Sequence, residues 1–448
     1  MVSTLRKKPL AWAVAFAGLG LAMGLVAPQA RATDNLRTSP YLFGDWNGER
    51  TRLADEGITF DLGYGGNAAH NFTGGRNSTG GTSHLTRYTD QWIGGVTLDL
   101  AKLWGWKGAT FRMLITDRNG RNLGADAHIG NNQLIQEVYG RGQTWHLTEF
   151  FLEQQFFDGA LAVKAGRLRV GGDFAAFSCD FQNLTFCGAQ PGNIVGGYWV
   201  NWPTSQWAAN IKLNTTKETY VMLGAYQVNP KYINDNYARH NGLIPDFPSG
   251  TTGVLIPLEF GWAPSAGGLP GSYKFGVWYN TSKGKDLYYD VNHDPAGKTG
   301  LPALQRDAQY GAHINFLQQV SGDAGSSGAS IFLNITQADR NTAATDRQVS
   351  LGMEYKGPFA RANDMIGFAV GETNANSRYA DFIKQNNART GEHVIVGDGN
   401  EYVTELFYSW SPIPSIFLRP NLQYILHPGG TRENSNAFVL GLNTSFTF

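Results

Sequence analysis

The sequence has few charged residues and, beyond residue 32, no long apolar run. Charged residues make up 16% of the 448-residue chain, and its 36 basic residues equal its 36 acidic ones in number. A nucleic-acid-binding protein carries a basic patch or stripe, so this balance argues against a nucleic-acid partner. No later segment approaches the roughly 18 consecutive apolar residues that a transmembrane helix needs. The mean hydropathy of −0.29 does not decide membrane placement, because barrel strands are apolar on one face only.

Cysteine is also scarce, and the two present, Cys179 and Cys187, lie close together. In an exported protein such a pair is expected to form a disulfide that closes a short loop. Two thiolates do not complete the four-ligand shell of structural zinc, and the histidines follow no metal-binding spacing. We therefore predict a disulfide, no metal site and no cofactor.

The N-terminus has the pattern of an export signal. Residues 6–8 are basic, residues 10–26 are apolar and rich in small side chains, and an Ala-x-Ala site ends at Ala32. This pattern is typical of a cleaved signal peptide rather than a membrane anchor, so residues 1–32 are expected to be removed. The mature chain would then hold 32 basic and 36 acidic residues, a net charge of −4.

Glycine and aromatic residues are abundant, and apolar and polar residues alternate in many short segments. The C-terminal segment is the clearest case, since Phe438, Leu440, Leu442, Phe446 and Phe448 share one face. Half-apolar strands are expected where one face meets lipid and the other meets water. A soluble β-sandwich also alternates, so periodicity alone leaves both folds open.

The lengths of the connections favour a membrane barrel. Sixteen strands are predicted, at 58–66, 91–100, 109–117, 147–157, 160–169, 207–214, 219–227, 253–262, 272–281, 308–318, 328–337, 347–357, 364–373, 401–410, 415–427 and 436–448. Gaps after even strands are short, such as Asp158-Gly159, whereas most gaps after odd strands are long. This alternation is typical of periplasmic turns and extracellular loops. We predict an all-β, transmembrane antiparallel barrel over residues 58–448, preceded by a periplasmic segment with a short helix at 33–57.

Four segments spread over the mature chain carry recognisable motifs. They are GDWNGERTRLADEGITFDLGY (44–64), LTEFFLEQQFFDGALAVKAGRL (147–168), FSCDFQNLTFCG (177–188) with VNWP (200–203), and LFYSWSPIPSIFLRPNLQYILHPGG (406–430). In these segments the chain resembles the carbohydrate-selective porin family, OprB type, although Asn47 stands where that family usually has glycine. The resemblance implies a sixteen-stranded pore in the outer membrane of a Gram-negative bacterium, one that favours glucose and other small sugars. It also supports the disulfide.

A diffusion pore needs no catalytic group, only binding weak enough to release its ligand. The sequence shows no convincing Ser/His/Asp arrangement, so we predict that the protein is not an enzyme. Charged and amide side chains can bind sugar hydroxyls, and aromatic rings can cover sugar faces. The alternative is a general or anion-preferring diffusion porin whose arginines attract phosphate or carboxylate.

Strand parity predicts which polar side chains face the pore, because a charge on the lipid face costs roughly 2–4 kcal/mol near the bilayer centre. The predicted pore-lining residues are Arg112, Glu149, Glu153, Lys164, Arg167, Arg169, Glu259, Arg419, Asn421 and Gln423. Arg167 and Arg169 have outward parity in an unbroken strand, and would need a bulge at Gly166 or a place at the rim. The alternative role for these charges is to pair with one another and hold the barrel shape.

The third long loop, 170–206, is a candidate constriction. It contains the cysteine pair together with Asp173, Asp180, Trp199 and Trp202. A loop closed by a disulfide loses less entropy on ordering, so it can fold into the pore and narrow it. Packing on the outer rim is the alternative.

Other expected partners follow from an outer-membrane location. The apolar strand faces are expected to contact outer-membrane lipid and lipopolysaccharide. The C-terminal strand ending in Phe448 is expected to engage the barrel-assembly machinery. The sequence reveals no interface from which an oligomeric state follows.

Overall fold

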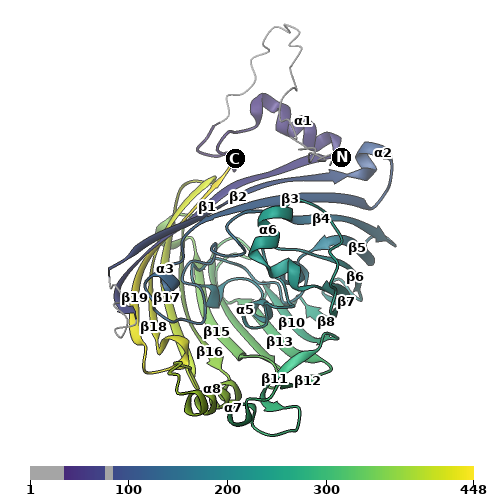
Figure 1. The fold of residues 1–448 in the computed structure, drawn as a ribbon. Helices are drawn as coiled ribbons and strands as arrows, with labels where there is room; N and C mark the ends of the chain where they lie inside the picture. The colour runs from purple at the N-terminus through teal and green to yellow at the C-terminus, as the bar shows by residue number, and fades with distance from the viewer. Residues whose placement is uncertain (1–34, 76–83) are drawn as a thin grey trace, which may run out of the picture. The chain divides into compact units, whose positions relative to one another are not determined.

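The computed structural model describes residues 35–75 and 84–448, which form a closed antiparallel β-barrel (Figure 1). The expected signal peptide falls in residues 1–34, outside the described residues. The barrel has sixteen strands, and each of the sixteen predicted strands overlaps one of them. The predicted fold is therefore confirmed.

The strands of the barrel are β1 (Ile58–Gly75), β2 (Thr86–Asp99), β3 (Ala109–Gly120), β4 (Trp145–Phe156), β5 (Leu161–Leu168), β6 (Gln206–Asn214), β7 (Thr219–Val228), β8 (Gly253–Trp262), β10 (Leu269–Asn280), β13 (Gln309–Gln319), β14 (Gly328–Ala338), β15 (Thr345–Lys356), β16 (Met365–Ala375), β17 (Asn400–Ile413), β18 (Ile416–Leu426) and β19 (Ser435–Thr447). Each pairs antiparallel with its neighbours along the chain, and β1 pairs with β19 to close the ring. β9 (Ser265–Ala266) pairs only with β10, and β11 (Gly284–Asp290) pairs with β12 (Ala303–Arg306) in a separate small sheet.

β1 is longer than predicted. It continues from the predicted end at residue 66 to Gly75. Small residues at Gly65, Gly66, Ala68 and Ala69 interrupt the apolar alternation, and this hid the second half of the strand. The first long loop is correspondingly shorter than the predicted 67–90.

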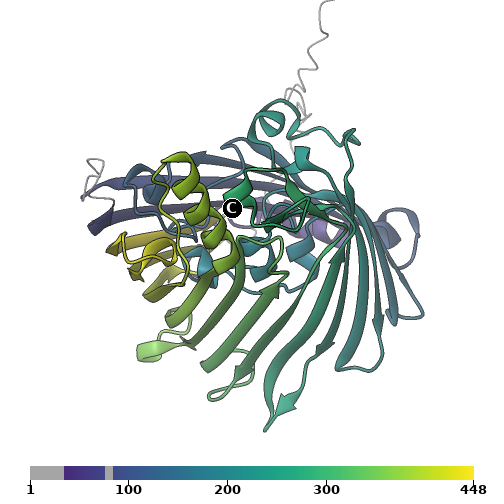
Figure 2. The ribbon, with the colours of Figure 1, turned by 60° about the horizontal axis from the view of Figure 1, so that its bottom comes forward.

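The helices are short and lie in the segments before and between the strands. They are α1 (Glu49–Glu56), α2 (Leu100–Trp104), α3 (Leu123–Asp126), α4 (Val170–Asp173), α5 (Gln190–Ile194), α6 (Asp235–Asn241), α7 (Ala296–Thr299) and α8 (Ser377–Thr390), with 3₁₀ turns η1 (Trp46–Gly48), η3 (Leu184–Phe186), η4 (Pro230–Ile233), η5 (Pro358–Ala360) and η6 (Pro428–Gly430). Across the described part of the chain, every helix is too short or too polar to cross a bilayer. Figure 2 shows α8 lying across the loop end of the barrel.

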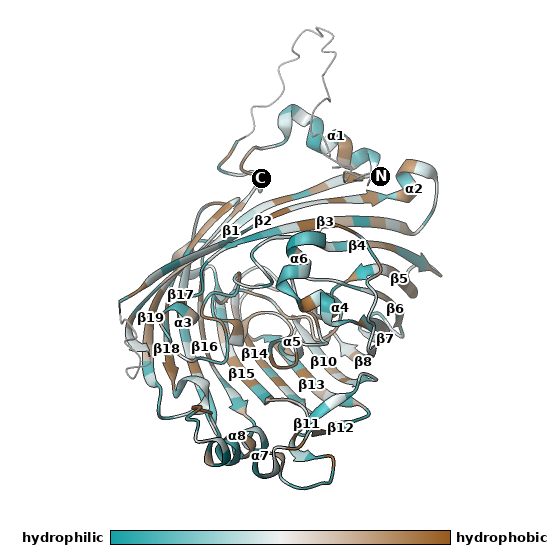
Figure 3. Ribbon diagram, viewed as in Figure 1, coloured by the Kyte–Doolittle hydropathy of each residue, from teal (hydrophilic) through white to brown (hydrophobic). Residues whose placement is uncertain are grey.

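Hydrophobic and hydrophilic residues alternate along the barrel strands (Figure 3). In β8, Ile256, Leu258 and Phe260 are exposed on the outside, whereas Glu259 between them is fully buried inside. The outer side chains remain accessible because no other element of the barrel covers them. In a bilayer, contact with lipid hydrocarbon removes such an apolar surface from water.

The residues before β1 pack on the seam where the barrel closes. The guanidinium of Arg50 lies over the rings of Tyr41 and Trp46, 3.7 and 4.2 Å from their centroids. One of its amino groups donates a hydrogen bond of 2.6 Å to the carbonyl of Phe448. The Phe43 ring stacks on the Phe448 ring at 5.1 Å. The predicted N-terminal helix is thus confirmed as α1, and its segment is fixed to the last residue of the chain.

Candidate functional site

Buried carboxylates on the barrel wall hold two long loops inside the barrel. Both oxygens of Glu405, on β17, accept hydrogen bonds of 2.8 Å, from the backbone N–H groups of Gln182 and Asn183. Glu259, on β8, accepts one of 2.6 Å from the N–H of Ala175. A buried carboxylate is costly unless hydrogen bonds satisfy it, so each contact fixes the loop to the wall. The loop 169–205 therefore lies within the barrel.

The loop between β3 and β4 is held in the same way. Glu401, on β17, accepts hydrogen bonds from the N–H of Asn132 at 2.6 Å and from the N–H of Gly429 at 2.7 Å. The Gln136 amide donates to the carbonyl of Asn67 on β1 at 2.8 Å. Residues 121–144 thus also fold inward, which the sequence did not indicate.

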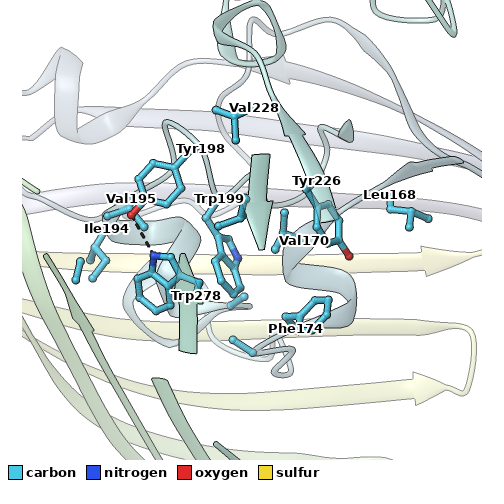
Figure 4. Packing of buried hydrophobic residues seen from close by; sticks show 14 of the residues in the cluster. Leu168, Val170, Phe174, Ile194, Val195, Tyr198, Trp199, Tyr226, Val228 and Trp278 are labelled. Atoms are coloured by element: carbon cyan, nitrogen blue, oxygen red, sulfur yellow. Dashed lines mark hydrogen bonds between the residues drawn. The ribbon is translucent and has the colours of Figure 1, made fainter. Parts of the chain in front are cut away.

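Apolar side chains of the loop 169–205 fill one part of the barrel interior. Trp199 is fully buried, with its ring centroid 5.3 Å from that of Trp278 on β10. The Trp278 indole N–H donates to the Tyr198 hydroxyl at 3.1 Å (Figure 4). Phe174 packs edge-on against Tyr226 at 6.0 Å. Trp199, expected at the constriction, is instead part of this packed core, so any passage lies elsewhere in the cross-section.

Several predicted residues meet in a network of ion pairs along β3, β4 and the start of α4. Arg112 donates to Glu149 at 2.6 Å and to Asp61 at 2.8 Å. Arg169 donates from its Nε to the other Glu149 oxygen at 3.0 Å. Arg112 and Arg169 keep 28% and 22% of their side chains exposed, so the network borders open space. Asp61 was not predicted.

A second ion-pair group lies beside the first. Lys164 Nζ lies 2.7 Å from an oxygen of Asp173 and 3.7 Å from an oxygen of Glu153. These three side chains border a cavity of about 590 Å³, which Lys212 and Tyr220 also line. The structure therefore brings three of the predicted residues together beside one cavity, namely Glu153, Lys164 and Asp173.

Through Arg169, the first network borders another cavity, of about 400 Å³, between the inward loops and the wall. Arg118, Glu137, Arg169 and Trp202 line it. The Arg169 guanidinium lies 4.8 Å from the centre of the Trp202 ring, and the Trp202 indole N–H donates to Gln91 at 2.9 Å. Charged donors, a carboxylate and a partly buried aromatic ring therefore surround one space. This combination suits a ligand with hydroxyl edges and C–H faces.

Arg118 and Glu137 form an ion pair that sequence reasoning missed. An Arg118 amino group lies 3.9 Å from a Glu137 oxygen, and another donates to the Tyr139 carbonyl at 3.1 Å. Burial raises the pKa of the Glu137 carboxyl to about 7, while the charge of Arg118 acts to lower it. Arg118 has the inward parity of Arg112, but the predicted strand ended at 117. No sequence pattern indicated Glu137.

The two cysteines form a disulfide beside this cavity. Glu137, Cys179 and Cys187 bring three potential metal-ligating atoms within 4.8 Å of one another. Both sulfurs are joined in the disulfide and are not thiolate ligands, so this group does not form a thiolate site.

Four predicted pore-lining residues face inward but support the loops instead of bordering open space. The Asn421 amide donates to Gln182 at 2.9 Å, and the Gln423 amide to the carbonyl of Ile135 at 3.2 Å. Arg419 donates to the carbonyl of Asp180, and Glu259 is fully buried at Ala175. The expectation that they line the pore is corrected, because the inward loops occupy the interior at these positions.

Arg167 was also predicted to line the pore, and this is wrong. It pairs with Phe150 and with Trp207 in the sheet, so it shares the outer face with them. The side chain is 6% exposed, donates to the carbonyl of Ser205 at 2.9 Å, and lies 4.9 Å from the ring of Tyr232. The loop after β7 therefore shields this outward charge. Arg169 does point inward, because β5 ends before it.

Comparison with known proteins gives consistent matches. The family model described as carbohydrate-selective porin, OprB family, matches residues 83–448. Porin B of Pseudomonas aeruginosa is 41% identical over 454 residues, covering 97% of this chain and 96% of that protein. The putative porin QuiX of Acinetobacter baylyi is 32% identical, covering 91% and 93%. The high-pH structure of Pseudomonas putida OprB is 41% identical with a TM-score of 0.87, covering 92% of this chain and 99% of that one.

Proposed function

The chain belongs to the carbohydrate-selective porin family, OprB type, and on that basis we propose that the cavity beside Trp202 and its ion pairs form the sugar-selecting constriction. The protein is a porin in the outer membrane of a Gram-negative bacterium, through which small sugars diffuse passively into the periplasm. The observation that carries the proposal is the joint lining of one cavity by Arg118, Glu137, Arg169 and Trp202.

The chemistry of this lining fits weak, selective binding of a sugar. Arginine presents a fixed fork of donors, the carboxylate accepts, and the Trp202 ring offers an apolar face. The ion pairs hold these groups in position before a sugar arrives. A neutral sugar then replaces water at groups that are already paired, so its affinity is low enough for release.

We extend the proposal to the remaining parts of the chain. Residues 1–32 would be removed on export and residues 33–57 would face the periplasm. The exposed apolar outer face supports contact with outer-membrane lipid and lipopolysaccharide. The C-terminal strand ending in Phe448 would engage the barrel-assembly machinery. The channel would carry out no catalysis.

An anion-preferring pore is the second candidate, and one observation favours it. Arg118 and Arg169 face a single carboxylate, Glu137, in the lining of the cavity. An excess of guanidinium groups attracts phosphate and carboxylate. Reversal potentials in a salt gradient separate the two functions, because a sugar-selective pore with paired charges gives only a small anion preference.

The proposed constriction is tested by Arg118→Gln, with Arg347→Gln as the control. Arg347 pairs with Glu372 at 2.9 Å and lines neither interior cavity. A hydrogen bond to a charged group contributes about 1.5–3 kcal/mol, so Arg118→Gln is expected to weaken glucose block of the ion current about tenfold or more. Unchanged block in Arg118→Gln, with the control also unchanged, counts against the constriction.

A further inference from the structure

A separate cavity of about 300 Å³ lies at the loop end of the barrel. Its wall comes from four loop regions, represented by Asn132, Thr345, Tyr379, Gly397 and Asn434. None of its lining residues belongs to the cavity beside Trp202. The long loops face the cell exterior in an outer-membrane barrel, so this cavity lies upstream of the constriction.

The lining of this loop-end cavity is neutral. None of the described residues that form it is charged, and its polar side chains are amides and hydroxyls, among them Asn132, Thr431 and Asn434. Tyr379 adds an aromatic ring. Within the described residues, the buried amide nitrogen of Asn132 has no hydrogen-bond partner. A phosphate or carboxylate ligand would call for arginine or lysine, whereas a neutral polyhydroxylated ligand matches amides, hydroxyls and a ring.

Close backbone packing holds the walls of the loop-end cavity in place. Glu401 accepts hydrogen bonds from the N–H groups of Asn132 and Gly429, joining two of the four loops. Gly397 packs so tightly that a Cβ atom there would lie 1.9 Å from the Gly429 carbonyl oxygen. A cavity that is formed in advance loses little entropy when a ligand binds. Its volume is at the lower end of the range for small-molecule pockets.

We propose that the loop-end cavity binds one neutral monosaccharide at the extracellular mouth, before the sugar reaches the constriction. The inference rests on the proposed function, to which it adds a first binding step for the same class of substrate. A site upstream of the constriction raises the frequency with which sugar enters it. Conduction through successive weak sites is a general property of selective pores.

The test is single-channel glucose block in planar bilayers, with glucose added to the loop side only. Tyr379→Ala removes the ring, Tyr379→Phe keeps it, and Phe247→Ala is a control at an exposed aromatic outside every cavity described above. An aromatic contact is worth about 0.5–1.5 kcal/mol, so Tyr379→Ala is expected to lower the rate of block by glucose about two- to tenfold. Tyr379→Phe is expected to stay within about twofold of the wild type, because the loss of one neutral hydrogen bond is small.

The outcomes separate this inference from the proposed function. If glucose blocks Tyr379→Ala at the same rate as the wild type, and still crosses the channel, the loop-end site alone is overturned. An equal loss of block in Phe247→Ala also overturns it, because the effect would then not be specific to the cavity. A wild-type channel that glucose neither blocks nor crosses overturns the proposed function as well.

Discussion

Interior charged residues of this barrel have two different roles, which Glu405 on the one hand and Arg112 and Arg169 on the other illustrate. Glu405 is fully buried and both its oxygens accept hydrogen bonds from backbone N–H groups, so it holds the loop and is not accessible to a ligand. Arg112 and Arg169 are partly exposed and paired with the same carboxylate. Strand parity predicted that Arg112 faces inward, but it gave Arg169 outward parity, and Glu405 was not among the predicted pore-lining residues. Parity does not reveal which inward residues the loops cover, because that depends on tertiary contacts.

Glu137 is expected to make the ion selectivity of the pore depend on pH. Its pKa is raised to about 7, so it is largely neutral below that pH and ionised above it. When it is neutral, the charge of Arg118 is unbalanced and attracts anions. The anion preference, measured from reversal potentials, should therefore fall as the pH rises from about 6 to about 8.

The matched variants for this prediction are Glu137→Gln and Glu392→Gln, the second at an exposed loop position. Glu137→Gln should keep the low-pH selectivity over the whole range. Glu392→Gln should behave as the wild type does. A wild-type selectivity that is constant over this range contradicts the prediction.

At the level of elements, the strands could be predicted from the sequence, but whether the loops lie inside the barrel or on its rim could not. Sixteen alternating segments and the contrast between short turns and long loops depend on local sequence. The inward fold of the loop 169–205 depends on Gln182 meeting Glu405, which are 223 residues apart in the chain. Nothing local to either residue indicates this contact. The sequence therefore left two positions open for the loop, and a long-range contact decides between them.

Glu405→Gln is expected to loosen the loop 169–205. The amide has one acceptor in place of two, and its own N–H groups would face the donors of Gln182 or Asn183. Leaving a buried donor without a partner costs about 1–3 kcal/mol. The loop should fluctuate, giving noisier single-channel currents and faster entry of larger sugars such as maltose.

The control for the loop is Glu372→Gln, a substitution of the same kind on the neighbouring strand β16, where Glu372 pairs with Arg347. It should leave current noise and maltose entry unchanged. If Glu405→Gln gives the same quiet currents as Glu372→Gln, the carboxylate does not hold the loop.

At the scale of the whole molecule, the N-terminal segment packs against the last residues of the chain, where the first and last strands of the barrel meet. Arg50 contacts Tyr41, Trp46 and the carbonyl of Phe448, and the backbone N–H of Leu42 donates to Thr447 at 2.7 Å. These contacts cover the place where β1 and β19 meet. The short helix was predictable from sequence, but its position against the C-terminus was not, because no local pattern encodes it.

Arg50→Gln is expected to lower the stability of the closed barrel by about 2–4 kcal/mol, from the lost cation–π contacts and the lost hydrogen bond. The measurement is the temperature at which the folded band disappears on gels of heated, detergent-solubilised protein. Arg52→Gln, on the same helix but with an exposed side chain paired to Glu49 and Glu56, should change this temperature little. Equal effects of the two variants would contradict a specific role for Arg50 at the seam.

The central claim is that sugars cross this barrel selectively through a constriction of paired charges and an aromatic ring. The most direct measurement is the flux of glucose, maltose and lysine, side by side, into liposomes that contain the purified protein. The account predicts that glucose enters fastest, that maltose is strongly retarded, and that lysine gains no advantage from its charge. Equal rates for the two sugars, or faster entry of lysine than of glucose, would contradict it.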